Sequence, residues 1–156
     1  MTALAGGDLS SSAAATQLCR RYGSQVMQRS RDFLGLLAAL MLIVSSGAHS
    51  IFGWRGLRGE LAVAHVPADL VLGLQIGWQF GGAAMLMLGV VLFVMFRQRL
   101  RGTNTPLLLA KAVAVTYLGF GAWALGASGG ELFFLVFLIP GAFLAMASLY
   151  RTQPSN

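Results

Sequence analysis

His49, Gln75 and Gln79 are the residues whose types and spacing come closest to a chemical site in this 156-residue sequence. Each lies inside a long apolar segment, where a polar side chain needs a hydrogen-bond partner or a ligand. Gln75 and Gln79 are four residues apart, so that they share one face of a helix. His49 lies near the end of one apolar segment and Gln75 near the start of the next. We therefore expect the three side chains to form an intramembrane polar cluster.

Two interpretations of this cluster remain open, a structural one and a ligand-binding one. In the first, the side chains only join helices through interhelical hydrogen bonds. In the second, His49 binds a metal ion or a redox group, but zinc needs three or four ligands and haem an axial histidine. The sequence has two histidines and one cysteine, so we predict no cofactor and no metal. One metal site remains an alternative, and its ligands would be the side chains of His49, Glu60, His65 and Asp69.

Residues typical of catalysis are scarce. The HExxH and phosphate-binding loop motifs are absent, and the sequence indicates no nucleophile with a neighbouring base. No Asp or Glu lies within an apolar segment, which argues against proton-coupled exporters that need a buried carboxylate. Lys111 lies near the end of its segment, where its side chain can reach the lipid headgroups.

Four apolar segments position these residues, at 33–52, 70–96, 107–127 and 132–150. About 20 apolar residues span a bilayer as a helix, and a backbone in lipid must satisfy its own hydrogen bonds. Only 10% of the residues are charged, against about 25% in a soluble domain. The sequence therefore predicts an all-α fold, an integral membrane four-helix bundle.

Small residues at a spacing of four mark two expected helix-packing faces. In lipid, close helix packing relies on small residues that let two backbones approach. One face would lie on the second helix and the other on the fourth, after Pro140. The residues concerned are Gly73, Gly77, Gly81, Gly141 and Ala145. Helical geometry places the glycines of the second helix opposite Gln75 and Gln79, so we expect that helix to have neighbours on both sides.

Arginines flank the apolar segments unevenly. Eight lie before the first segment, between the second and third, or after the fourth, whereas only Arg55 and Arg58 lie in the first loop. Short loops rich in arginine stay in the cytoplasm, so both the N- and C-termini are expected there, in a multi-pass protein of the bacterial inner (plasma) membrane. The expected membrane-surface residues are Arg20, Arg21, Arg29, Arg31, Arg97, Arg99 and Arg101.

The segments outside the membrane are short. We expect residues 1–32 to form a basic cytoplasmic tail that is partly disordered or a surface helix, residues 33–150 the membrane domain, and residues 151–156 a second tail. The loop at 53–69 has room for a short interfacial helix, and Pro67 followed by Asp69 predicts the start of the second helix.

Two stretches carry a resemblance to known proteins. GAHSIFG (residues 47–53) and IGWQFGGAAML (residues 76–86) resemble uncharacterised small bacterial four-helix integral membrane proteins. The family pattern has a histidine–serine pair at the end of helix one and a second histidine early in helix two. This sequence has Gln79 at the second position, so the resemblance implies a four-helix membrane fold without a paired-histidine site, and it implies no activity.

We therefore expect a non-catalytic accessory or scaffold subunit of a bacterial inner-membrane complex. Its expected partners are other membrane-protein subunits or further copies of itself, and lipids that are anionic at the cytoplasmic face. Nucleic acid is not an expected partner, because no stripe of arginines and aromatic residues occurs. The alternatives are a small oligomeric transporter or channel and, third, a membrane redox or metal-binding protein that uses His49.

Overall fold

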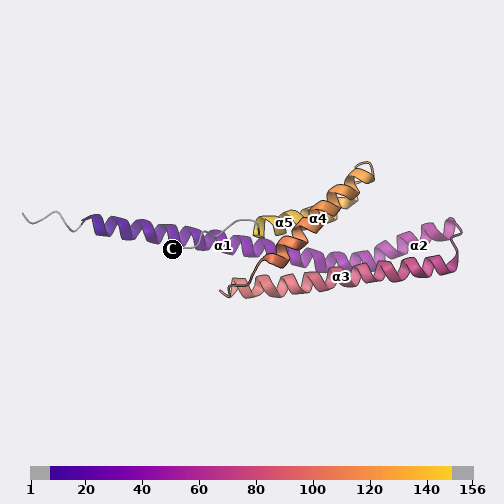
Figure 1. Ribbon diagram of the computed structural model, residues 1–156, viewed down its shortest axis with the longest axis horizontal. Helices are drawn as coiled ribbons and strands as arrows, with labels where there is room; N and C mark the ends of the chain where they lie inside the picture. The colour runs from indigo at the N-terminus through magenta and orange to yellow at the C-terminus, as the bar shows by residue number, and fades with distance from the viewer. Residues whose placement is uncertain (1–7, 149–156) are drawn as a thin grey trace, which may run out of the picture.

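A computed structural model describes residues 8–148 of the chain, and within that range the side chains of Gln17 and of residues 22–148. This part of the chain is helical apart from short turns, and it contains no strand (Figure 1). The predicted all-α fold is therefore confirmed for these residues. The predicted C-terminal tail, the last two residues of the fourth segment and residues 1–7 lie outside them. The helices are α1 (Asp8–Ala48), α2 (Trp54–Val63), α3 (Ala68–Leu100), α4 (Leu108–Ala127) and α5 (Leu135–Ser148).

α1 and α2 form one continuous rod, joined by a π-helical turn at His49–Gly53. The first proline of the chain is Pro67, so nothing before it removes a backbone donor from the helix. Glycines within the rod each weaken a helix by about 1 kcal/mol without breaking it. Residues 8–32 are therefore helical and belong to the same helix as the first apolar segment.

The expected loop at 53–69 is also mostly helical. Only the residues between Val63 and Ala68 leave the helix, and among them His65 has a left-handed backbone with φ of 53°. Pro67 then precedes α3 directly, as its position in the sequence predicted. The short helix expected in this loop exists as α2, and it extends the rod and pairs with α3.

α3 packs antiparallel along the rod through residues seven apart. On α3 these are Gly82, Gly89 and Phe96. A Cβ atom added to Gly89 would lie 2.8 Å from Ile43 Cγ1, and the ring of Phe96 covers Gly35. A repeat of seven keeps one seam of a helix facing its partner. Glycine on one helix opposite a larger side chain on the other brings the two backbones close together.

α4 and α5 form a second hairpin. Its turn contains Gly129 and Gly130, whose φ angles of 73° and 99° favour glycine. Between the two helices, a Cβ atom added to Gly141 would lie 3.1 Å from Leu118 Cγ, so this glycine is a point of close approach. The fourth apolar segment starts as a short 3₁₀ turn (Leu132–Phe134), and Pro140 lies inside α5.

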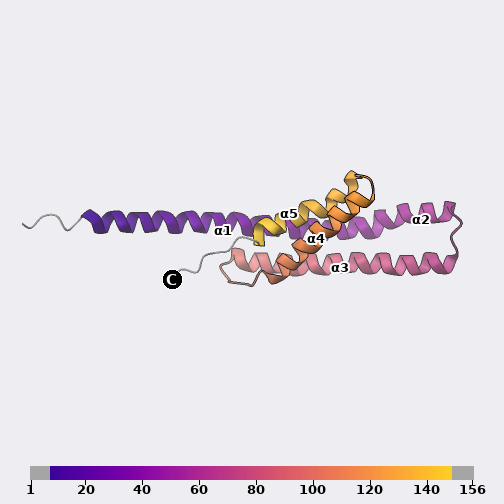
Figure 2. The same ribbon diagram turned by 45° about the horizontal axis from the view of Figure 1, so that its top comes forward.

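The two hairpins meet at one end and diverge toward the other (Figures 1 and 2). We call the end where they meet the basic end, because α3 ends there in Arg97 and Arg99. α5 packs against α1 at this end, while the turn between α4 and α5 lies away from the rod. The four long helices are therefore arranged as two hairpins that share a core at one end. The fully buried core residues are Ala38, Ala39, Leu42, Leu92, Phe96, Ala110 and Leu144.

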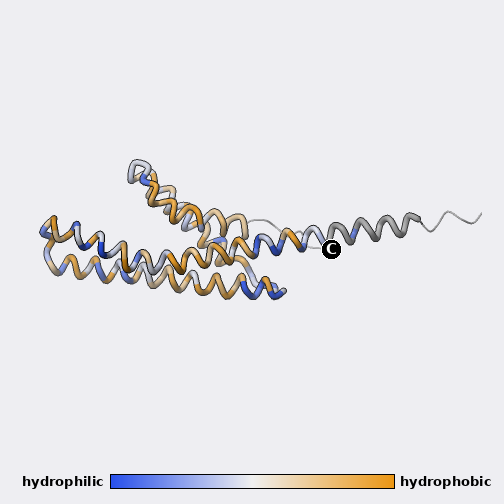
Figure 3. The backbone as a smooth tube through the Cα atoms, turned by 180° about the vertical axis from the view of Figure 1, so that it is seen from behind, coloured by the Kyte–Doolittle hydropathy of each residue, from blue (hydrophilic) through white to orange (hydrophobic). Residues whose placement is uncertain are grey.

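Apolar residues dominate the helices between the basic end and α2 (Figure 3). Within the described residues, three helices are long and apolar enough to cross a membrane: Tyr22–Val63, Ala68–Leu100 and Leu108–Ala127. Residues Leu132–Ser148 form a shorter apolar segment. Many large apolar side chains are exposed, and contiguous apolar surface of this kind suits lipid or another protein rather than water.

Candidate functional site

Polar side chains form two clusters at different levels of the α1–α3 pair. The first, which we call the His49 cluster, contains His49, Ser50, Trp78 and Gln79. The imidazole of His49 stacks on the indole of Trp78, with ring centroids 4.3 Å apart and planes at 6°. Trp78 Nε1 also donates a hydrogen bond of 2.8 Å to the His49 carbonyl oxygen. One side chain of α3 thus holds both the ring and the backbone of His49.

The π-helical turn explains why backbone carbonyls take part in the His49 cluster. The His49 carbonyl accepts the N–H of Trp54, five residues on, which is the hydrogen bond of a π-helix. Gln79 Nε2 donates to the Ser50 carbonyl at 3.1 Å. Gly82 leaves room for the Ser50 hydroxyl, which a Cβ atom at that position would meet. The cluster therefore fastens the π-helical turn of the rod to α3.

The structure brings only some of the predicted residues together. Gln79 bonds the backbone next to His49, whereas Gln75 is half-buried and forms no side-chain hydrogen bond with any residue of the described chain. A Cβ atom on Gly81 would lie 3.6 Å from His49 Nε2. Gly73 and Gly77 are exposed, and a Cβ atom on either would have no neighbour within 4 Å. Gly81 therefore faces the rod, and only Gly73 and Gly77 form an open glycine face.

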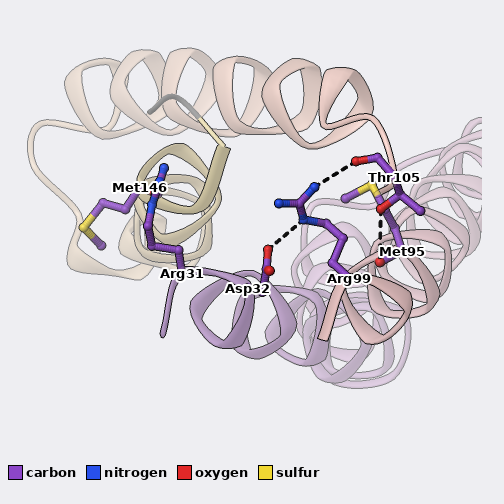
Figure 4. Close-up of polar contacts among 6 residues, drawn as sticks. All are labelled: Arg31, Asp32, Met95, Arg99, Thr105 and Met146. Atoms are coloured by element: carbon purple, nitrogen blue, oxygen red, sulfur yellow. Dashed lines mark hydrogen bonds and ion pairs between the residues drawn. The ribbon is translucent and has the colours of Figure 1, made fainter. Parts of the chain in front are cut away.

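The second cluster lies at the basic end and contains Asp32, Arg99 and Thr105 (Figure 4). We call it the Asp32 cluster. Arg99 Nε donates to Asp32 Oδ1 at 2.7 Å, and Arg99 Nη1 donates to the Thr105 carbonyl at 2.9 Å. The side chains of Asp32 and Arg99 are only 4% and 9% exposed. This buried ion pair ties α1 to α3 and to the loop that leads into α4.

A neighbouring contact ties α1 to the second hairpin. Arg31 donates through Nε and Nη2 to the Met146 carbonyl, both at 3.3 Å (Figure 4). Met146 lies in the last turn of α5, where carbonyl oxygens lack helical partners and bind cationic side chains well. Two adjacent residues of α1 therefore contact different helices: Asp32 contacts α3 and Arg31 contacts α5.

The remaining predicted residues belong to α1, to α5 and to the end of α3 with the residue that follows it. Arg29, Arg97 and Arg101 are exposed. Arg20 and Arg21 belong to α1, but their side chains lie outside the described part. In α5, Gly141 is buried against α4 and Ala145 packs at the edge of the core.

Three features of these sites were not predicted from the sequence. No role was assigned to Trp78 from the sequence, although its indole N–H needs an acceptor when buried. The pairing of Asp32 with Arg99 was missed, although both residues border the apolar segments at the same end. The third feature is the seven-residue spacing of Gly82 and Gly89, which was overlooked in favour of a spacing of four.

One further stretch matches an enzyme motif in its letters. Gly126–Gly130 reads GASGG, which has the glycine–serine–glycine spacing of a hydrolase nucleophile turn. Here the stretch is the turn between two helices, without the preceding strand of that motif. Ser128 Oγ donates to the Leu125 carbonyl and accepts the Glu131 N–H, so the hydroxyl stabilises the turn.

Neither cluster has the composition of a metal centre. Across residues 8–148, no group of three or more His, Cys, Asp and Glu side chains is placed to hold a metal ion. The structure does place the two stretches that carry the family resemblance against each other, through the His49 cluster. No protein-family model matches the chain, and neither a curated protein nor a solved structure shows significant similarity to it.

Proposed function

We propose that this chain is a multi-pass protein of the bacterial inner membrane with both termini in the cytoplasm. Three helices of membrane-spanning length support membrane insertion. The orientation rests on the arginines, because Arg29, Arg97 and Arg101 are exposed at the basic end and short arginine-rich loops stay in the cytoplasm. Fusions to a phosphatase that is active only in the periplasm, and to a fluorescent protein that is active only in the cytoplasm, test this orientation. Activity of the phosphatase fused in the α2–α3 turn, but not at either terminus, is the expected result.

We further propose that the chain is a non-catalytic accessory or scaffold subunit of a membrane-protein complex. The observation that carries this proposal is the open glycine face of α3, formed by Gly73 and Gly77. Among residues 8–148, α3 packs mainly against α1, and less extensively against α2 and the turn between them. Two exposed glycines one turn apart let a second backbone approach closely, which in lipid is the main basis for helix association.

Gentle extraction followed by native mass spectrometry tests the subunit proposal. The expected particle contains this chain with other polypeptides in fixed ratio. Gly77→Leu should release the chain from that particle, because a branched side chain would hold the partner backbone away. Ala83→Leu is the matched control, since Ala83 is exposed on another side of α3, and it should leave the particle intact.

Two outcomes would contradict the subunit proposal. A discrete homo-oligomer without other polypeptides would overturn it and favour the small oligomeric transporter or channel. An unchanged particle with Gly77→Leu would mean that the open glycine face contacts lipid. Absorption of a bound haem in the purified particle would instead favour a redox role for His49.

A further inference from the structure

A pocket of about 410 Å³ opens at the basic end between the two hairpins. Its walls come from α1, from the end of α3, from the loop between α3 and α4, and from Ala147 of α5. This volume lies within the usual range for small-molecule sites. The loop reverses at Gly102, whose φ of 90° favours glycine, and the reversal leads into Thr103 and Asn104. The pocket is therefore shaped by parts of the chain that the Asp32 cluster holds in place.

The charges that line the pocket favour an anion. Among the residues that the structure describes, Arg31 and Arg99 line it together with one carboxylate, that of Asp32. Asp32 is 3% exposed and its Oδ1 accepts from Arg99, so its charge is offset before a ligand arrives.

Neutral donors complete a set that suits a phosphate group. Gln28, Thr103 and Asn104 also line the pocket, and all three residues are exposed. Amides and hydroxyls donate hydrogen bonds, and a phosphate offers several strong acceptor oxygens to such donors and to guanidinium groups. A carboxylate ligand has only two oxygens, so it would accept hydrogen bonds from fewer of these donors.

The position of the pocket at the polar–apolar boundary favours a lipid over a soluble phosphate. Asp32 is followed at once by Phe33, and Leu107 at the pocket is followed by Leu108. Phe33 and Leu108 are 65% and 78% exposed. A lipid could thus place its phosphate in the pocket and its acyl chains along exposed apolar side chains, whereas a soluble ester would use only the pocket.

We propose that this pocket binds the phosphate of an anionic phospholipid headgroup. Basic pockets between helices at the cytoplasmic surface are suited to such headgroups. This inference rests on the membrane location proposed above, but not on the role as a subunit. A bound lipid would contact α1, the α3–α4 loop and α5 together, and would therefore strengthen the junction of the two hairpins.

Native mass spectrometry of the delipidated full-length protein tests the pocket. Phosphatidylglycerol and phosphatidylcholine with identical acyl chains are added in equal amounts, and we expect phosphatidylglycerol to bind in preference. Arg31→Gln should lower that preference about fivefold. Asn104→Leu, in the exposed loop and outside the core, should lower it as well. The matched control is Arg97→Gln, which removes the same charge from an exposed residue that does not line the pocket, and it should leave the preference near wild type.

Three results would overturn the inference. Equal binding of the two lipids would show that the pocket does not select an anionic headgroup. An equal loss with Arg97→Gln and with Arg31→Gln would assign the preference to diffuse surface charge. Displacement of phosphatidylglycerol by glycerol 3-phosphate would assign the pocket to a soluble ester. Release of the protein from membranes by alkaline carbonate would instead contradict the proposed membrane location, so the two failures are distinguishable.

Discussion

The His49 cluster and the Asp32 cluster connect the same two helices in opposite ways. The His49 cluster uses a stacked ring pair and neutral side chains that donate to backbone carbonyls. The Asp32 cluster uses a buried ion pair and extends beyond α3 into the loop before α4. Next to it, Arg31 reaches α5. One cluster therefore joins two helices, whereas the other lies at the junction of both hairpins.

This difference explains why the hairpins diverge. At the level of the His49 cluster, the contacts hold α3 to the rod, and the second hairpin takes no part in them. At the basic end, charged side chains and the apolar core connect α1, α3, α4 and α5. The junction is thus confined to one end, which leaves the open glycine face of α3 accessible at the other.

The largest effect should follow from loss of the Asp32 carboxylate. Asp32→Ala leaves the Arg99 guanidinium buried without its partner, which typically costs about 3–5 kcal/mol. The free energy of unfolding in mixed micelles should fall by that amount. Spin labels at exposed Leu72 and Leu132, one on each hairpin, should show a broader distance distribution.

The control for this change is Asp69→Ala, which removes an exposed carboxylate from the first turn of α3. Its cost should stay below about 1 kcal/mol, with an unchanged distance distribution. If Asp32→Ala behaves like Asp69→Ala, the ion pair does not hold the hairpins together.

A second prediction contrasts two glycines of α3. Gly89→Leu forces a side chain against Ile43 on the rod, and overpacking of this kind costs about 1–3 kcal/mol. Gly77→Leu should leave the stability of the isolated chain near wild type, because a Cβ atom there would meet no neighbour within 4 Å. Thermal unfolding in detergent measures both, and equal destabilisation would contradict the described α1–α3 seam.

A smaller effect is expected at the His49 cluster. Trp78→Phe keeps an aromatic ring beside His49 but removes the hydrogen bond to its carbonyl, which costs about 1 kcal/mol. Because this cluster joins only α3 and the rod, the distance between the labels at Leu72 and Leu132 should not change. A broadened distribution would show that the cluster also positions the second hairpin.

The smallest effect has the opposite sign. The Tyr117 hydroxyl in α4 is buried and has no hydrogen-bond partner within the described chain. Tyr117→Phe removes this unsatisfied group, so it should be neutral or should stabilise the protein by up to about 1 kcal/mol. Unfolding in mixed micelles measures the change, and a clear loss of stability would reveal a partner for the hydroxyl.

The helices themselves could be predicted because their signals are local. Long apolar segments and Pro67 place α3 and α4 within a few residues of their observed ends. The continuity of α1 through His49 into α2 could not be predicted in this way. Glycines at 53, 56 and 59 indicate a loop by composition, but packing of α2 against α3 outweighs their low helix propensity.

The contents of the two clusters were harder to predict, because they depend on register between distant helices. A histidine and a glutamine in apolar segments indicate polar contacts, and His49 and Gln79 do lie in one cluster. The observed hydrogen bonds are donated to backbone carbonyls at a π-helical turn. Residue types alone do not indicate such a turn. The pairing of Asp32 with Arg99 depends on the same register of α1 and α3.

The most direct test of the proposed subunit role is photo-crosslinking in the native membrane. A benzophenone amino acid replaces Phe80, an exposed aromatic residue three positions after Gly77 and thus close to it on the helix surface. The same label at exposed Trp123 of α4 is the control. We expect a strong adduct with a different polypeptide from position 80 and a much weaker one from position 123. Adducts only with lipid, or only with a second copy of this chain, would contradict it.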